Sequence, residues 1–260
     1  MRKKEESRRT GLARALSKLG YCSRSQAMAL IRAGRVNLNG TVRRDPETPV
    51  RLEYDRIAVD GRPVASETKI YLMMNKPRGL ITSAADEQGR QTVYALLDKA
   101  KAHGGEADQT ALPWIAPVGR LDKASEGLLL LTNDSEWAAR ITDPETGLLK
   151  TYHVQIDTVV DEERVQSLAR GLPHNGEILR AKSAQVLRSG EKNCWLEILL
   201  DEGRNRQIRR MLAALGVEVL RLVRVAIGPL ALGDLAKGAV RPLTGAEKLS
   251  LDRAIKSKAS

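Results

Sequence analysis

The stretch of sequence that decides the fold covers residues 119–134 and reads Gly119-Arg120-Leu121-Asp122-Lys123-Ala124-Ser125-Glu126-Gly127-Leu128-Leu129-Leu130-Leu131-Thr132-Asn133-Asp134. Its four consecutive leucines are followed by turn residues, which is the pattern of a buried strand. Asp122 stands before this strand and beside Arg120, where the chain turns. From position alone, Asp122 is a candidate either for a carboxylate that caps the turn or for one that carries chemistry.

The segments around this stretch contain more strand patterns than helix patterns. Strands are predicted within residues 70–74, 115–118, 150–160, 195–199 and 217–225, and helices around residues 137–141 and 211–215. Because the strands and helices do not alternate regularly, the pattern favours an α+β fold with a mixed, mainly antiparallel sheet. Residues 98–111 are rich in Ala, Lys, Gly, Asp and Gln, so we expect an exposed loop there.

The composition excludes several classes of protein. Apolar residues make up 42% of the 260 positions and charged residues 29%, which is typical of a folded globular chain. The two cysteines, Cys22 and Cys194, are too few for a disulfide framework and favour a reducing compartment. No apolar run approaches the roughly 18 residues of a membrane span, and residues 1–6 do not resemble a secretory signal. We therefore expect a cytoplasmic protein without membrane attachment. We also expect a monomer.

Positive charge is concentrated at the N-terminus. The chain has 43 Lys and Arg against 32 Asp and Glu, and residues 1–64 hold 15 of the basic residues and 7 of the acidic ones. Nine basic and no acidic side chains occur between Ser7 and Arg44. A surface of one sign indicates a polyanionic partner, although a basic arm that only increases solubility is the alternative.

The same N-terminal region has clear folding signals. The leucines at positions 12, 16 and 19 mark one face of a helix, and Ser23 with Gln26 forms a capping box that begins a second helix. Asn39-Gly40 and Asp60-Gly61 predict tight turns between short strands. We expect this small basic module to present five arginines to solvent: Arg24, Arg32, Arg35, Arg43 and Arg44.

These N-terminal residues resemble the RNA-binding domain first described in ribosomal small-subunit protein four. The resemblance covers about residues 10–66 and depends on Ser23-Arg24, Gly34-Arg35-Val36 and Asn39-Gly40. It implies a domain at residues 1–66 that binds structured RNA through its helix pair and basic face. Charge alone would also permit DNA, but the sequence has no zinc-finger spacing and no basic zipper.

Most of the usual catalytic motifs are absent from the sequence. The three histidines are scattered and have no paired cysteines near them, so no metal site is expected. Glycine-rich phosphate loops and serine nucleophile elbows are missing. A second cluster, residues 202–210, contains four arginines at the start of a helix, where the apolar residues Ile208 and Met211 lie on either side of Arg209. If the helix turns Arg209 toward the core, its charge requires a carboxylate partner.

Taken together, the segments resemble the pseudouridine synthases of the RsuA/RluB/RluE/RluF type. Besides the basic domain, the resemblance depends on Met74-Asn75-Lys76-Pro77-Arg78-Gly79, residues 119–134, Lys150-Thr151-Tyr152, and Glu202-Gly203-Arg204-Asn205-Arg206-Gln207-Ile208-Arg209-Arg210-Met211. It implies a catalytic domain at residues 67–252, followed by a tail at 253–260. It also implies that Asp122 is the catalytic aspartate, Tyr152 the active-site tyrosine and Arg209 the basic residue that pairs with the aspartate.

The reaction implied by this resemblance converts uridine in ribosomal RNA to pseudouridine. It needs neither a redox change nor a group donor, so no cofactor is expected. An ionised carboxylate could attack the ribose or remove a ribose proton, and the sequence leaves both roles open. The target uridine must leave the RNA stack, at a cost of about a few kcal/mol. Beyond the five N-terminal arginines, RNA binding is expected from Arg120, Arg204, Arg206 and Arg210.

Two other functions remain open from the sequence. One is a non-catalytic factor that binds ribosomal RNA or a ribosome-assembly intermediate, although binding alone does not require Asp122, Tyr152 and Arg209 together. The other is the same chemistry on transfer RNA. The arginine-rich run at residues 202–210 is more similar to the members that act on the large ribosomal subunit, so large-subunit RNA is the expected substrate.

Overall fold

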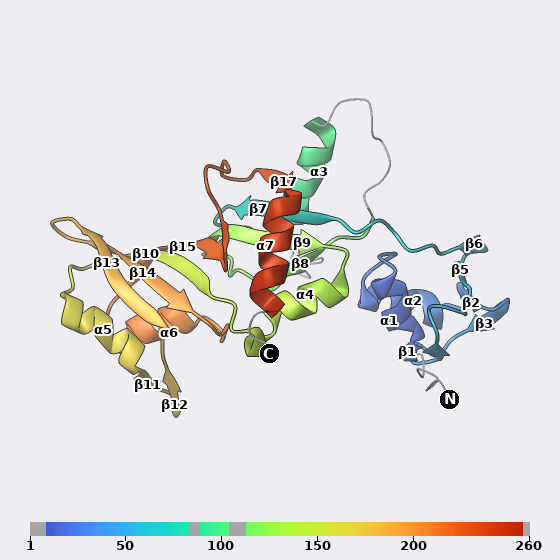
Figure 1. Cartoon of the computed structure of the whole chain (residues 1–260), viewed down its shortest axis with the longest axis horizontal. Coiled ribbons are helices and arrows are strands. Elements are labelled where there is room, and N and C mark those ends of the chain that lie inside the picture. Colours follow the sequence, from blue (N-terminus) through green and yellow to red (C-terminus); the bar gives the residue numbers. More distant parts are fainter. Residues whose placement is uncertain (1–8, 84–88, 104–112, 257–260) are drawn as a thin grey trace. The chain divides into compact units, whose positions relative to one another are not determined.

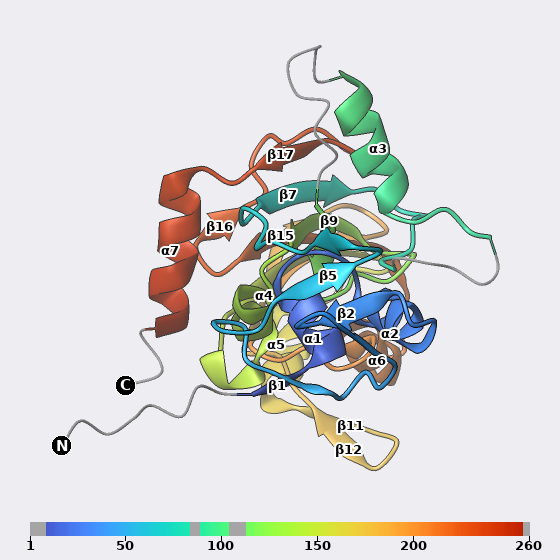
Figure 2. The same ribbon diagram turned by 90° about the vertical axis from the view of Figure 1, so that its right-hand side faces the viewer.

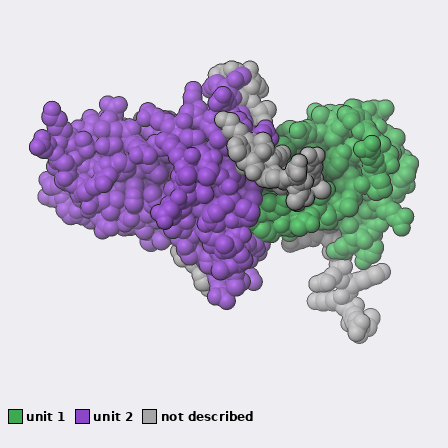
Figure 3. Space-filling model, turned by 90° about the horizontal axis from the view of Figure 1, so that it is seen from above, with its two compact units in different colours: residues 1–71, 109–116, 132–137 green, residues 72–108, 117–131, 138–260 purple. Residues whose placement is uncertain are grey.

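The computed structural model describes residues 9–83, 89–103 and 113–256 (Figure 1). The chain divides into two units, coloured separately in Figure 3. The first contains residues 1–71, 109–116 and 132–137, and the second contains residues 72–108, 117–131 and 138–260. Each unit is described by itself below.

The N-terminal part of the first unit consists of two helices and short strands. In chain order these are β1 (Thr10–Gly11), α1 (Leu12–Lys18), α2 (Arg24–Arg32), β2 (Val36–Leu38), β3 (Thr41–Arg43), β4 (Pro49–Val50), β5 (Ile57–Val59) and β6 (Arg62–Pro63). Four of the strands form an antiparallel sheet in the order β3-β2-β5-β6, and β1 pairs with β4. The apolar faces of α1 and α2 pack with these strands into one core.

Local sequence explains the boundaries of these elements. Ser23 caps α2, because its side chain accepts a hydrogen bond from the Gln26 N–H while the Gln26 side chain accepts one from the Ser23 N–H. This is the predicted capping box. At the hairpin between β2 and β3, Asn39 and Gly40 have φ angles of 52° and 82°, as the predicted tight turn requires.

The second unit is built on a nine-stranded sheet. Seven strands follow the order β13-β14-β10-β15-β9-β7-β17, while β16 pairs with β15 and β8 with β9. Their bounds are β7 (Tyr71–Lys76), β8 (Ala116–Val118), β9 (Glu126–Thr132), β10 (Lys150–Ile156), β13 (Ser183–Ser189), β14 (Cys194–Leu200), β15 (Val219–Ile227), β16 (Leu230–Ala231) and β17 (Val240–Pro242). The pairs β13/β14, β14/β10, β10/β15, β15/β16 and β7/β17 are antiparallel, and β15 runs parallel to β9. The predicted α+β fold with a mixed, mainly antiparallel sheet is confirmed.

The strand at the centre of the opening motif is buried along its whole length. All seven residues of β9 are buried, as a strand covered on both faces requires. Gly127 allows β9 to approach β15 closely. Its φ is +100°, and a Cβ at this position would lie 2.2 Å from the carbonyl oxygen of Arg224. Both the backbone conformation and the space therefore require glycine here.

Helices and one hairpin complete the description. The remaining elements are α3 (Tyr94–His103), α4 (Ser135–Thr142), a 3₁₀ turn (Pro144–Thr146), α5 (Glu162–Arg170), the hairpin β11 (Leu172–His174) and β12 (Glu177–Leu179), α6 (Gln207–Ala214) and α7 (Gly245–Lys256). Helices α5 and α6 cover one face of β13, β14, β10 and β15, and their apolar side chains share one core with these strands. Helix α3 lies beside β17, and α7 beside β16 (Figure 2).

Two expectations about the chain's segments need correction. Residues 98–103 belong to helix α3 and not to a loop; the rest of the expected loop, residues 104–111, lies outside the described residues. Helix α7 continues to Lys256 and buries Ile255, so residues 253–256 are part of a packed helix and not of a tail. Throughout the described ranges, no helix combines the length and the apolar character needed to cross a membrane.

Candidate active site

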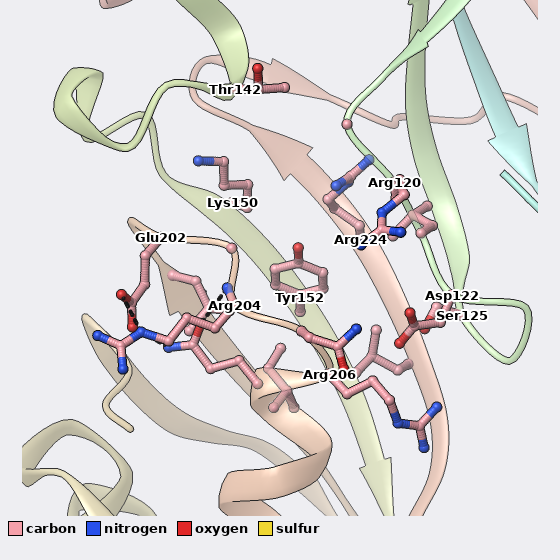
Figure 4. Close-up of a pocket in the computed structure, with 18 of the residues that line it drawn as sticks. Arg120, Asp122, Ser125, Thr142, Lys150, Tyr152, Glu202, Arg204, Arg206 and Arg224 are labelled. Atoms are coloured by element: carbon pink, nitrogen blue, oxygen red, sulfur yellow. Dashed lines mark hydrogen bonds and ion pairs between the residues drawn. The ribbon is translucent and has the colours of Figure 1, made fainter. Parts of the chain in front are cut away.

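A cavity of about 290 Å³ lies in the second unit, over the side of the sheet that also carries Tyr152 (Figure 4). Its walls are the loop before β9, the end of α4 with the turn that follows, the loop before α6, and strands β10 and β15. The sequence-predicted residues that line it are Arg120, Asp122, Tyr152, Arg204, Arg206 and Arg209. Its size approaches that of pockets for single small ligands, which are typically about 300 Å³ or more.

A buried lysine holds the backbone of the turn that carries Asp122. The Lys76 ammonium, which is fully buried at the end of β7, donates hydrogen bonds to the carbonyl oxygens of Asp122 (3.2 Å) and Ser125 (2.9 Å). The Ser125 N–H also donates to the Asp122 carbonyl at 2.9 Å. Burial lowers the pKa of Lys76 to about 8, although the negative charges of Asp122 and Glu126 act in the opposite direction. This turn is therefore fixed by contacts to its backbone, which leave the Asp122 carboxylate unused.

The other side of the loop is fixed as well. The Thr82 hydroxyl donates to the carbonyl oxygen of Leu121 at 2.8 Å and accepts from the Leu121 N–H at 3.3 Å. The Gly79 N–H donates to the carbonyl of Lys123 at 2.7 Å. Held on both flanks, Asp122 has little freedom to move, which is the condition for a group that must meet a reacting atom in one geometry.

The carboxylate of Asp122 is half-buried and, among the described residues, takes part in no hydrogen bond or ion pair. The ion pair expected with Arg209 is absent. Arg209 instead donates to the carbonyl oxygens of Val219 (3.3 Å) and Ala124 (3.2 Å), and its buried Nε has no acceptor among the residues that the structure describes. Burial first, and then the charge of Arg206, lower the pKa of Arg209, whereas the charge of Asp122 raises it. Arg209 therefore acts on Asp122 through its electric field and through the backbone of the loop.

Tyr152 lies in the middle of β10, opposite Ile198 on β14 and Arg224 on β15. The ring is half-buried against the core under the sheet, and Figure 4 shows it in the middle of the cavity. A side chain at the centre of a strand that is paired on both sides is held firmly. The cavity thus brings together a carboxylate, a phenol and a guanidinium, the three groups to which the sequence assigned chemistry.

The arginines around the cavity divide into two groups. Arg120 and Arg206 are exposed at its edge. Arg204 also lines the cavity, but it forms ion pairs with Glu202 (2.9 Å) and Glu177 (2.8 Å). Arg210 does not line the cavity and pairs with Glu177 on the β11–β12 hairpin. The hairpin therefore neutralises part of the charge that the sequence assigned to RNA binding.

The five predicted arginines of the first unit are all exposed. Arg35 is paired with Asp60 through two hydrogen bonds of 2.9 and 2.5 Å, and Arg44 donates to the carbonyl oxygen of Arg32 at 3.3 Å. The side chains of Arg24, Arg32 and Arg43 have no protein partner among the described residues. These three, together with Arg44, whose partner is a carbonyl oxygen, carry the positive charge of the five arginines that no acidic group among the described residues compensates.

Lys150 and Arg224 also line the cavity. The sequence did not identify these two cations as site residues. Arg224 is only 6% exposed, although the strand pattern around it is apolar. Lys150 precedes Tyr152 by two residues on the same strand and therefore shares its face. That spacing was the available signal for Lys150, and an arginine at an inward position of β15 was the signal for Arg224.

A residue that shapes the loop before α6 was also missed. The Gln207 side chain is 2% exposed and donates from its amide nitrogen to the Arg180 carbonyl (3.0 Å) and to Glu202 Oε1 (2.6 Å). Its amide oxygen accepts from the Arg204 N–H at 3.2 Å.

In the part of the chain that the structure covers, no group of three His, Cys, Asp or Glu side chains is arranged to hold a metal ion.

Comparisons with known proteins show the family to which this chain belongs. The family model described as RNA pseudouridylate synthase matches residues 70–214, and the S4 domain model matches residues 10–57. An uncharacterized RNA pseudouridine synthase of Aquifex aeolicus is 36% identical over 92% of each chain, and the ribosomal large subunit pseudouridine synthase B of Bacillus subtilis is 34% identical over 90% of this chain and 91% of its own. A solved pseudouridylate synthase structure, 33% identical, covers 93% of this chain and 99% of its own with a TM-score of 0.62. The chain belongs to the RNA pseudouridylate synthase family and has an S4 domain at its N-terminus.

Proposed function

We propose that this chain converts a specific uridine of ribosomal RNA to pseudouridine, and that the RNA is that of the large subunit. Family membership supports the reaction. The name of the similar Bacillus subtilis protein and the arginine-rich run at residues 202–210 support the large subunit. The observation that carries the proposal is the Asp122 carboxylate, rigidly held in a cavity of nucleoside scale and without a partner there.

In this proposal Asp122 acts on the ribose of the target nucleotide. Two routes use a carboxylate at this place: attack on C1′, which forms an ester, and removal of a ribose proton. Both require the carboxylate to be ionised, and Arg209 places a positive charge near it. Fixed positive charge in a cavity with little water stabilises a charged reacting group more than it would in water.

Tyr152 contacts the base after its bond to the ribose has broken. Its ring offers a surface for stacking, and its hydroxyl relays the proton that leaves the base carbon when the new bond has formed, taking that proton as it gives up its own. All these groups come from one chain, so the proposal is compatible with the monomer expected from the sequence.

The basic residues hold the RNA while the target nucleotide is extruded. We assign phosphate contacts to Arg120 and Arg206 at the cavity edge, with Arg204 and Arg210 beside them. A second set of contacts comes from the arginines of the S4 domain. Their binding energy offsets the unstacking of the uridine, which costs about a few kcal/mol.

The test uses Asp122→Asn in the full chain. We expect turnover to be abolished, because the amide is neither an ionised nucleophile nor a base, while RNA affinity stays within a few-fold. The measurements are pseudouridine formation in transcripts of large-subunit RNA and RNA binding by filter retention. Near-normal turnover would remove Asp122 from the mechanism, and a wild-type chain that binds RNA but forms no pseudouridine would support a non-catalytic factor.

The substrate is tested separately. Pseudouridines are mapped in the ribosomal and transfer RNA of cells with and without the protein. Loss of one site in large-subunit RNA is the expected result, and loss of a site in transfer RNA or small-subunit RNA would refute the substrate assignment.

A further inference from the structure

Arg224 lines the cavity as a buried cation whose guanidinium has fewer hydrogen-bond acceptors than it has nitrogen donors. The Arg224 side chain is 6% exposed and donates from Nε to the Leu128 carbonyl oxygen at 2.8 Å. Nη2 is buried and has no acceptor, and Nη1 has none among the described residues. A buried guanidinium normally has a hydrogen-bond acceptor for each nitrogen, since unpaired charge in the interior is costly. This cavity therefore contains donors that its own protein groups do not satisfy.

A second cation lines the same cavity. Lys150 is half-buried on β10, and its ammonium has no hydrogen-bond or ion-pair partner among the residues described. Burial and then the positive charge of Arg224 lower the pKa of Lys150, and the charge of Asp201 only partly opposes this. Two cations that repel each other at one site indicate that the site is built for negative charge.

The position of Arg224 and Lys150 indicates that they contact the base of the target nucleotide and not the RNA phosphates. Arg224 is the direct cross-strand neighbour of Tyr152, so the two side chains stand on one face with their Cβ atoms about 5 Å apart. The exposed arginines, Arg120 and Arg206, lie at the cavity edge, where a phosphate chain can pass. A group as buried as Arg224 is reached by the part of the nucleotide that enters furthest, which is the base that meets Tyr152.

The reaction supplies the missing negative charge. When the bond between C1′ and N1 breaks heterolytically, its electron pair stays with the base and is shared by N1, O2 and O4. This holds whether Asp122 forms an ester with C1′ or removes a ribose proton. The base then rotates and bonds to C1′ through C5, which breaks the ester bond and frees Asp122 on the first route, or is accompanied by return of the proton to the ribose on the second. The C5 proton leaves, and N1 gains a proton. The overall change is an isomerisation with no atom or electron lost.

We propose that Arg224 and Lys150 form an anion site that binds the oxygens of the departing uracil and stabilises its negative charge. The inference rests on the proposed function and assigns two catalytic residues beyond Asp122, Tyr152 and Arg209. Because the charge on the base exists only after the bond begins to break, the site stabilises the transition state more than the bound substrate.

The first experiment compares Lys150→Gln, Arg224→Lys and Arg224→Gln with the wild type in single-turnover reactions on a large-subunit transcript. We expect each variant to react about 100-fold more slowly, the typical loss for one donor to a developing anion, with RNA affinity unchanged within about 3-fold. Arg188→Gln is the matched control, because Arg188 is an exposed strand arginine outside the cavity. It should retain the wild-type rate.

The melting temperatures of the variants distinguish a catalytic role of Lys150 and Arg224 from a structural one. Among the described residues Lys150 has no hydrogen-bond or ion-pair partner, and Arg224 repels it, so Lys150→Gln should leave the melting temperature unchanged or raise it while the reaction slows. If Arg224→Gln fails to fold, Lys150→Gln and Arg224→Lys still decide. A lower melting temperature in proportion to the lost activity would overturn the proposal.

The second experiment places 5-fluorouridine at the target position. Fluorine withdraws electrons and makes the base anion less basic, so bond cleavage depends less on the cations. We expect the rate deficits of the Lys150 and Arg224 variants to shrink at least 5-fold, measured as loss of 5-fluorouridine from nuclease digests. Equal deficits on both substrates, or an RNA affinity that falls as much as the rate, would overturn the anion site. A wild-type enzyme inactive on uridine would instead overturn the proposed function.

Discussion

The pH dependence of the free energy of unfolding tests how Lys76 holds the loop that carries Asp122. Its ammonium is fully buried and bonds to three carbonyl oxygens, those of Pro77, Asp122 and Ser125, at 3.1, 3.2 and 2.9 Å. Burial lowers its pKa from 10.5 to about 8. The perturbation is a change of pH from 7 to 9.5, applied to the wild type and to Lys76→Met.

The sign and size follow from linkage. Below pH 8 the lysine is protonated in both the folded and the unfolded chain, so its effect on the free energy of unfolding is constant. Between pH 8 and 10.5 the folded chain loses the proton first, so the unfolded chain binds more protons and stability rises with pH. One pKa unit corresponds to about 1.4 kcal/mol, which makes the whole effect about 3 kcal/mol and the part up to pH 9.5 about 2 kcal/mol.

The assay is urea denaturation followed by circular dichroism at several pH values. The difference between wild type and Lys76→Met is the decisive quantity, because other groups titrate in the same range. Burial raises the pKa of Cys22 to about 11, for example, which lowers stability above pH 9 in both proteins. We expect the wild type to gain about 2 kcal/mol relative to Lys76→Met from pH 7 to 9.5. Lys182→Met, which removes an exposed lysine, should behave like the wild type, and parallel curves for wild type and Lys76→Met would refute the reasoning.

Two further predictions concern the sheet and the S4 domain. Gly127→Ala should lower the free energy of unfolding by about 3 kcal/mol or more, because its Cβ meets the Arg224 carbonyl at 2.2 Å and its φ is +100°. Gly245→Ala, with open space and no left-handed backbone, should be neutral or slightly stabilising in the same urea titration. Replacing Arg24, Arg32 and Arg43 with Gln should weaken RNA binding and reduce the slope of log affinity against log salt by about 2 to 3, measured by fluorescence anisotropy. An unchanged slope would show that these arginines do not contact phosphates.

Local chemistry explains why much of the fold could be predicted from the sequence. The Ser23–Gln26 capping box and the Asn39-Gly40 turn involve residues within three positions of each other, and both are present. The leucine run gave the buried strand β9, because a continuous apolar segment has few other stable environments. Residues 98–103 were mistaken for a loop, because their small and polar side chains carry little periodic signal although alanine and lysine favour helix.

The residues of the candidate site divide in the same way. Asp122, Tyr152 and Arg209 could be chosen from motifs, and all three line the cavity. Their partners could not. Arg209 bonds to the carbonyl of Ala124, 85 residues away in sequence, and the Arg204 and Arg210 side chains reach Glu177 across 27 and 33 residues. Motifs identify which charges are present, but they do not identify which of them are neutralised.

The sequence by itself determined the capping box that begins α2, the Asn39-Gly40 turn, the buried strand β9, the order of the two domains and the carboxylate in the turn before β9, since each depends on neighbouring residues. Only the tertiary structure decided that Lys76 bonds to the backbone of the Asp122 loop, and that Arg224 and Lys150 line one cavity with no ion pair to an acidic group among the described residues. The physical reason is that burial and charge pairing depend on which strands become neighbours. Strands β9, β10 and β15 come together from residues 126–227, and no local pattern encodes that meeting.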